Sequence, residues 1–305
     1  MRNPIISLCL FLLLANSFSC DLSAQELEPR ALTALPKGLN FAAVGYGFAT
    51  GNTLLDPALP LEDFNGNINT IVLAYVKSID FWGKSGKLDA ILPFAGGDFT
   101  GSFEGEGFKD SYTGFGDLRL RATINLTGAQ ALDPEEFKSF KQKTVTGLGV
   151  QVTIPTGNYK KEQLPNLGSN RWSVRVNYGI SQTYDRWVLE AHVGAWFFSK
   201  NKAFLGDNSL EQSSLWVLKA NIIRSFNKKG MWLAFSTGYG YGAQTYVNNI
   251  RRDAVISQLR LGATYALPLS KKNILKFAVG SGIRLQQGAD FDVFGVTFSH
   301  LWLDK

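Results

Sequence analysis

The alternation of apolar and polar side chains constrains the fold of this chain more than any other feature. It is clearest at residues 118–127, where every second side chain is apolar. The apolar positions are Leu118, Leu120, Ala122, Ile124 and Leu126. Because successive side chains of a strand point to opposite faces of the sheet, this segment predicts a strand with one apolar and one polar face. Both a soluble sandwich and a membrane barrel contain such strands, so their number and length must decide.

Strand patterns recur along the whole chain and predict about twelve strands in all. Besides 118–127 they cover residues 38–48, 67–78, 87–96, 144–155, 171–182, 186–198, 213–225, 231–243, 254–267, 274–286 and 291–302. Most are about ten to thirteen residues long, which suits a tilted strand that crosses the hydrocarbon layer better than the roughly five-residue strands of soluble sheets. The sequence therefore predicts an all-β fold, an antiparallel up-and-down transmembrane β-barrel.

The connections between these segments differ in character. Five are predicted turns, and six, among them 49–66, 97–114 and 200–213, are mostly longer and polar. Bacterial outer-membrane barrels have an even number of strands, short periplasmic turns and longer outer loops. We therefore expect both chain ends on the periplasmic side. In one turn, Asp133 precedes Pro134, which predicts a short helix that Asp133 caps.

Composition supports a barrel in a single domain. The mean hydropathy is -0.03, whereas a bundle of membrane helices would need several runs of about twenty apolar residues. Aromatic residues make up 13% of the chain, and several occur where a barrel has its interface rings. Near the turns these are Trp187, Phe226, Trp232 and Trp302, and near the outer loops Trp172, Phe197, Trp216 and Tyr241.

The start of the chain has the features of a secretory signal peptide. Arg2 gives it a positive charge, and the apolar stretch that follows is too short to span a bilayer. We expect residues 1–24 to be removed by cleavage after Ala24, with lipidation at Cys20 as the alternative. Both cysteines, Cys9 and Cys20, lie in this segment. The mature chain is therefore expected to have no disulfide and no thiolate metal site.

Residues 25–37 lie between this signal and the predicted barrel, residues 38–305. The segment is polar and contains two prolines, Pro29 and Pro36. It could remain in the periplasm or fold into the lumen as a plug, and the sequence leaves both alternatives open.

Charged residues at one parity of the strands are predicted to line the lumen. An Arg or Lys on the lipid face at mid-membrane costs roughly 2 to 4 kcal/mol, so the charged parity should face inward. The candidates are Asp89, Arg119, Arg121, Arg175, Glu190, Lys219, Arg260, Lys276 and Arg284. Such a mainly basic wall could select solutes, since guanidinium groups hold carboxylates. The alternative is a packed interior in which the charges form salt bridges.

The last predicted strand has an aromatic face that resembles an outer-membrane assembly signal. Phe294, Val296, Phe298, His300 and Trp302 share this face. Three residues follow Trp302, whereas the signal usually ends on the terminal aromatic residue. We expect the partners of the chain to be outer-membrane lipid and, through this strand, the barrel assembly machinery.

Motifs for catalysis are not found in the sequence. The two histidines, His192 and His300, lie on different predicted strands, and neither has a serine at a suggestive spacing. No Gly-x-Ser-x-Gly or His-Glu-x-x-His motif occurs, and the glycines of residues 238–242 lie in a strand pattern. Basic residues alternate along strands instead of forming a surface patch, which argues against nucleic acid as a partner. We expect no enzyme, cofactor or metal site.

Several segments resemble the phenol meta-degradation-pathway outer-membrane protein family. They are residues 26–32 (ELEPRAL), 55–63 (LDPALPLED), 114–121 (GFGDLRLR), 166–172 (NLGSNRW), 195–198 (AWFF) and 288–291 (GADF). The resemblance spans nearly the whole mature chain and implies a transporter-like, porin-like β-barrel in the outer membrane of a Gram-negative bacterium. Some relatives are associated with uptake of aromatic or other hydrophobic compounds. No catalytic residue can be carried over.

Two functions agree with these observations. The first is a passive or gated channel, or transporter, for small solutes, aromatic or hydrophobic ones included, with a basic lumen lining. The second is a structural or surface-interaction barrel with a closed lumen and no transport, whose loops, particularly residues 97–114, bind partners.

Overall fold

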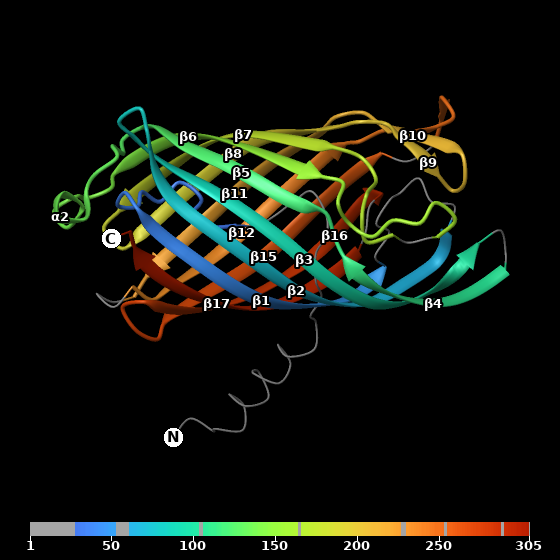
Figure 1. Cartoon of the computed structure of the whole chain (residues 1–305), viewed down its shortest axis with the longest axis horizontal. Coiled ribbons are helices and arrows are strands. Elements are labelled where there is room, and N and C mark those ends of the chain that lie inside the picture. The colour runs from blue at the N-terminus through green and yellow to red at the C-terminus, as the bar shows by residue number, and fades with distance from the viewer. Residues whose placement is uncertain are drawn as a thin grey trace, which may run out of the picture.

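The alternating segments form strands that pair with their chain neighbours until the sheet closes on itself. The computed structural model describes residues 28–52, 61–103, 106–163, 166–226, 230–252, 255–287 and 290–304. They form a closed barrel of twelve antiparallel strands (Figure 1), which confirms the predicted fold. The barrel strands are β1 (Leu39–Asn52), β2 (Leu61–Phe81), β3 (Lys84–Phe103), β5 (Leu118–Thr127), β6 (Thr144–Ile154), β7 (Ser173–Tyr184), β8 (Trp187–Phe198), β11 (Leu215–Ser225), β12 (Trp232–Gly242), β15 (Ile256–Pro268), β16 (Asn273–Gln287) and β17 (Asp290–Leu303).

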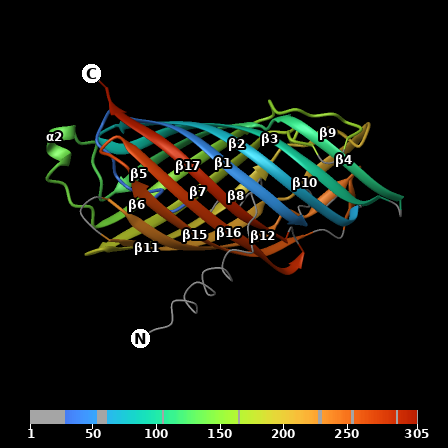
Figure 2. The ribbon, with the colours of Figure 1, turned by 90° about the horizontal axis from the view of Figure 1, so that it is seen from below.

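The barrel closes where its last strand pairs with its first. β17 runs antiparallel to β1, from Leu39 opposite Leu303 to Asn52 opposite Asp290, and the two strands lie side by side in Figure 2. Closure leaves none of the twelve strands as a free edge through the body of the barrel. A membrane-spanning sheet requires this, because hydrocarbon offers no partner for an open N–H or C=O group.

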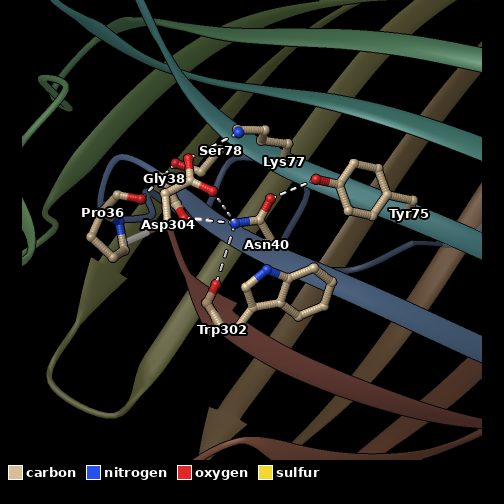
Figure 3. Close-up of polar contacts among 8 residues, drawn as sticks. All are labelled: Pro36, Gly38, Asn40, Tyr75, Lys77, Ser78, Trp302 and Asp304. Carbon is tan, nitrogen blue, oxygen red and sulfur yellow. Dashed lines mark hydrogen bonds and ion pairs between the residues drawn. The ribbon is translucent and has the colours of Figure 1, made fainter.

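A polar cluster fastens this seam at the end of the barrel where the chain terminates (Figure 3). Asn40 is 1% exposed, and its amide nitrogen donates to Asp304 Oδ1 at 2.8 Å, while its amide oxygen accepts from the Tyr75 hydroxyl at 2.6 Å. Lys77 Nζ pairs with Asp304 Oδ2 at 2.9 Å. The cluster joins β1, β2 and the residue that follows β17. It therefore links the two ends of the barrel sequence by side chains as well as by the strand ladder.

Residues 97–114, predicted as an outer loop, instead form most of a hairpin that extends β3 beyond the barrel wall. The added strand is β4 (Glu106–Phe115), which pairs with the second half of β3, while β5 pairs with its first half. Between β4 and β5, residues 116–118 lie opposite residues 92–93, which is a β-bulge. Pro93 has no N–H to donate, and its carbonyl accepts from the Gly116 N–H at 2.9 Å. The prediction of a loop was wrong because β3 continues past the bulge.

The predicted connection at 200–213 also contains strands. β9 (Asn201–Phe204) and β10 (Asn208–Gln212) form a hairpin that joins β13 (Thr245–Val247) and β14 (Ile250–Arg251) in a separate four-stranded sheet. This sheet lies at the same end of the barrel as β4, which we call the β4 end (Figure 1). Its apolar residues Phe204, Leu210 and Val247 pack with Phe99 and Ile68 from the barrel wall.

The opposite end carries the predicted helix and is called the α2 end. α2 (Pro134–Phe137) is one turn long, and Glu136 Oε2 accepts from the Asp133 N–H at 3.1 Å. The short helix after Asp133 is thus confirmed. The C-terminal end of the described chain lies at this end too (Figure 1). Among the residues described, no helix is long and apolar enough to span a membrane.

Burial along the barrel strands is inverted relative to a water-soluble protein. On β11, Trp216, Leu218 and Ile222 are exposed, while Lys219 and Asn221 are buried. The exposed fraction is 57% for Leu218 and 8% for Lys219. An apolar outer face with a polar inner face is typical of a barrel that lipid surrounds.

The polarity of the two faces reverses along β2 towards the β4 end. In the body of the barrel, Leu73 and Tyr75 are exposed and Thr70 is buried, whereas nearer the β4 end Asn67 is exposed and Ile68 is buried. β3 shows the same change, since Leu88 is exposed in the body of the barrel and Phe99 is fully buried nearer the β4 end. The β4 end therefore has the burial pattern of a protein in water, with its apolar residues turned inward.

Candidate functional site

Residues 28–37 lie along the inner side of the barrel at the α2 end and contact strands far apart around its circumference. Lys87 on β3 donates to the Ala31 carbonyl at 2.6 Å, and the Arg30 guanidinium donates to the Ser225 hydroxyl of β11 at 2.9 Å. Arg30 also lies over the Trp232 ring of β12, 5.1 Å from its centroid. A short segment that reaches β3, β11 and β12 must cross the interior.

Trp232 was expected in an outer aromatic ring, and this expectation was wrong, because its parity on β12 turns the ring inward against Arg30. The other predicted ring residues are exposed, with fractions between 37% and 58% for the whole set. These residues are Trp172, Trp187, Phe197, Trp216, Phe226, Tyr241 and Trp302.

Apolar contacts fix the middle of this segment. Leu32 is fully buried and packs with Ala34, Ala129 and Val145. Gly147 on β6 leaves the space that Leu32 occupies, since a Cβ atom there would lie 2.4 Å from Leu32 Cδ2. The following residues then tie the segment to the wall, because the Pro36 carbonyl accepts from the Ser78 hydroxyl at 2.6 Å and the Lys37 N–H donates to the Leu132 carbonyl at 2.9 Å (Figure 3 shows the Pro36 contact).

The first ionic cluster of the interior joins Glu28 to the barrel wall. Arg121 Nη1 donates to Glu28 Oε2 at 2.5 Å, and Arg121 Nε pairs with Asp89 Oδ2. Burial alone would raise the pKa of Glu28, but the Arg121 guanidinium, helped by Lys276 and Lys87, lowers it well below its ordinary value. Glu28 is therefore ionised at neutral pH. This cluster combines two of the predicted lumen residues, Asp89 and Arg121, with a residue of the N-terminal segment.

A second cluster surrounds Glu190 on β8. Its Oε2 accepts from the Arg30 N–H at 2.9 Å and from the Asn221 amide at 2.9 Å, and the His192 Nε2 lies 4.0 Å away. Gly179 on β7 makes room for the imidazole, because a Cβ atom there would lie 2.2 Å from His192 Nδ1. Glu190 is thus held between the N-terminal segment and its strand neighbours.

Three of the remaining predicted lumen residues, Arg175, Lys219 and Arg260, are buried in the barrel wall. Arg175 stacks over the Trp196 ring at 5.6 Å, Lys219 and Arg260 are buried on β11 and β15, and Arg119 is partly buried. Lys276 acts on Glu28 through its charge. The side chain of Arg284 lies outside the described residues.

A belt of buried polar atoms without hydrogen-bond partners runs round part of the interior. Among the described residues with such atoms, the belt on β3, β5, β6, β7, β8, β11 and β12 comprises Asp89, Asn125, Gln151, Ser181, Glu190, His192, Asn221 and Ser236. A dry protein core rarely leaves so many polar atoms unsatisfied. Buried polar atoms of this kind usually have water or another polar group as a partner.

Sequence reasoning missed Glu28, Arg30, Lys87 and His192 as parts of these clusters. Lys87 has the same strand parity as Asp89 and could have been included on that ground. Glu28 and Arg30 have no such signal, because the contacts they make join residues 93 and 160 positions apart in the sequence. Within the described part of the chain, no group of three or more potential ligands could hold a metal ion.

Comparisons with solved structures find the same fold in a bacterial channel. An outer membrane channel from Pseudomonas putida F1 is 20% identical, covers 91% of this chain and 100% of its own, and superposes with a TM-score of 0.74. The transport unit of the autotransporter AIDA-I from Escherichia coli is 10% identical, with 98% of each chain covered and a TM-score of 0.49. The beta domain of the Bordetella autotransporter BrkA is 12% identical, covers 87% of this chain and 100% of its own, and has a TM-score of 0.48.

No curated protein sequence matches the chain significantly. Residues 44–288, most of the predicted barrel, match the family described as the putative MetA-pathway of phenol degradation. The chain therefore belongs to this family, and its fold is a closed antiparallel β-barrel.

Proposed function

We propose that the mature chain is an outer-membrane channel for small solutes, aromatic or hydrophobic ones included. The observation that carries this proposal is the inverted burial of the barrel, with apolar side chains outside and a belt of unsatisfied polar atoms within. A closed barrel of this kind is stable in lipid, and a path for solutes would run through its polar interior. Its fold similarity to the Pseudomonas putida channel supports the same function.

The path would be lined mainly by basic residues. Of the nine predicted lumen residues, only Asp89 and Glu190 are acidic. Arg121, Arg175 and Arg260 are buried or nearly so on the inner parity of their strands. Fixed positive charge in a narrow passage favours anions over cations, because charged walls raise the local concentration of counter-ions.

The orientation that we propose places the α2 end in the periplasm and the β4 end outside the cell. The reversal of polarity along β2 and β3 supports it, because Asn67 and Asp98 at the β4 end are exposed and polar where lipid would require apolar side chains. Signal cleavage after Ala24 and assembly through β17 belong to the same proposal. The signal residues lie outside the described part of the chain.

Residues 28–37 would act as a plug in the resting channel. Leu32, Arg30 and Glu28 each contact the inner wall, and their partners lie on strands from β3 to β12. Solutes could then pass only when the segment withdraws or shifts, since it crosses the interior at the α2 end.

Single-channel conductance and liposome swelling test the function directly. The refolded chain of residues 25–305 is compared with residues 38–305, and folding of both is checked by the slower gel mobility of a heat-denatured barrel. Steps from both chains establish a channel that residues 25–37 do not close. Steps only from residues 38–305 establish the channel and the plug together.

Silence from both folded chains would refute the channel. It would favour the second function, a structural or surface-interaction barrel with a closed lumen. The apolar cluster at the β4 end supports this alternative, because Leu210 and Val247 of the small sheet pack with Phe99 of the barrel wall.

A further inference from the structure

Arg121 is bound at once by a carboxylate of the wall and by a carboxylate of the plug. Asp89, on the neighbouring strand β3, pairs with Nε, and Glu28, on the N-terminal segment, pairs with Nη1 at 2.5 Å. The Asp89 side chain is 3% exposed and that of Arg121 is 15% exposed. The wall therefore supplies one permanent partner for the guanidinium, and the plug supplies a removable one.

Glu28 of the plug lowers the excess of positive charge around Arg121. Lys87, Arg121 and Lys276 carry three positive charges near Glu28, and Asp89 carries one negative charge. Without Glu28, these four wall residues have a net charge of 3 − 1 = +2, and with it the sum is +1. Lys87 Nζ also loses its acceptor when the plug leaves, because it donates to the Ala31 carbonyl at 2.6 Å.

An uncompensated buried charge is strongly unfavourable, so the empty position attracts another anion. The planar fork of a guanidinium suits a carboxylate better than a spherical ion. The group that fills the position is itself a carboxylate, which shows that the geometry fits this class of ligand.

We propose that Arg121, with Lys87 and Lys276, forms a binding site for the carboxylate of a small organic solute, and that Glu28 occupies this site as a built-in competitor. The inference rests on the proposed channel and adds a class of solute to it. A solute carboxylate that takes the place of Glu28 would stabilise the withdrawn plug, since both cannot bind Arg121 Nη1 together. Binding and opening are then coupled by competition for one guanidinium.

Equilibrium dialysis with labelled benzoate measures this site without any need for conductance. Benzyl alcohol serves as the neutral ligand with the same ring. Residues 38–305 should bind benzoate saturably, and residues 25–305 at least tenfold more weakly. The variant Glu28→Gln of residues 25–305 should regain a large part of the difference, because it keeps the plug and removes only the competing charge. Benzyl alcohol should not bind saturably to any of these chains.

Two substitutions in residues 38–305 locate the site. Arg121→Gln should abolish saturable benzoate binding. Arg224→Gln should retain it, and this variant is the matched control, because Arg224 is exposed on the outer face of β11 and lies over the Trp187 ring. All chains are first shown to be folded by heat-dependent gel mobility.

Equal benzoate binding by folded residues 38–305 and their Arg121→Gln variant would overturn the proposal. A complete lack of saturable binding by folded residues 38–305 would overturn it too. Conductance without benzoate binding would leave the channel and remove the site. Benzoate binding without conductance would leave the site and remove the channel.

Discussion

Leu32 provides the sharpest test of the plug, because its side chain is fully buried although it belongs to a segment outside the barrel strands. It packs with Val145 and Ala129, and the partly buried rings of Phe137 and Phe140 lie against the same cluster. The substitution Leu32→Ala removes these contacts and leaves the ionic contacts of Glu28 and Arg30 unchanged. It should therefore weaken the packing of residues 28–37 against the barrel interior without altering the barrel.

The expected size of this effect follows from measured leucine truncations. Replacement of a buried leucine by alanine costs about 2.7 to 5 kcal/mol, depending on how far the neighbours close the space. We take the lower end, about 3 kcal/mol, because the cluster around Leu32 is small. A difference of about 1.4 kcal/mol changes an equilibrium tenfold, so the withdrawn plug should become roughly a hundredfold more populated.

A single engineered cysteine reports this population. Residues 25–305 contain no cysteine, so Ala34→Cys places a unique thiol in the buried cluster, where Ala34 is 3% exposed. Labelling by a water-soluble maleimide requires withdrawal of the plug. The rate should rise by about two orders of magnitude when Leu32→Ala is added, in line with the population change. Leu218→Ala is the control, since this leucine is exposed on the outer face of β11.

Equal labelling rates with and without Leu32→Ala would refute the reasoning. They would mean that the contacts of Leu32 do not hold residues 28–37 in place, and that this segment leaves the interior equally often without them. If Leu218→Ala also raised the labelling rate of the Ala34→Cys chain, the barrel would instead be unstable as a whole.

Three further predictions address other parts of the molecule. The double substitution Arg119→Gln and Arg121→Gln should shift the reversal potential in a salt gradient towards cations, and an unchanged potential would exclude both residues from the path. Asp304→Asn should lower the unfolding temperature at pH 7, because the hydrogen bond from Lys77 lowers the pKa of Asp304 and so stabilises the folded barrel. This stabilisation is present above about pH 4 and disappears as the pH falls. The unfolding temperatures of the variant and the parent should therefore converge in acid. Phe99→Ala should destabilise the β9–β10 hairpin by about 3 to 5 kcal/mol, seen as faster amide exchange there, and unchanged exchange would show that the apolar cluster does not hold the hairpin.

The strands of the barrel could be predicted because their signal is local. On β11 every second residue is buried, and the sequence of this strand shows the same period of two. The β4 hairpin could not be predicted in this way, because the rule that apolar side chains face outward holds only beside lipid. Phe99 and Ile68 obey the opposite rule, since water surrounds that part of the structure in the proposed orientation.

The candidate site could be predicted only in part, for a related reason. Strand parity selected Asp89, Arg121 and Glu190, whose buried positions follow directly from the period of two. Parity says nothing about what fills the space between opposite walls. The partners of these residues, Glu28 and Arg30, come from a segment without strand periodicity, and only the closed barrel brings them together.

The contacts at the two ends of the barrel differ in kind, and this difference bears on what would open the proposed channel. At the α2 end the plug combines the buried Leu32 with the ionised Glu28, so its withdrawal leaves both an apolar space and an excess of positive charge. At the β4 end the contacts of Phe99 and Leu210 are apolar, and a hydrophobic group that replaces them would weaken them.

A solute with an aromatic ring and a carboxylate offers both kinds of contact, and it could replace the contacts at each end in turn. A purely apolar solute offers no replacement for Glu28, and an inorganic anion offers none for the cluster of Phe99. The proposed channel would therefore favour amphipathic acids over either class alone.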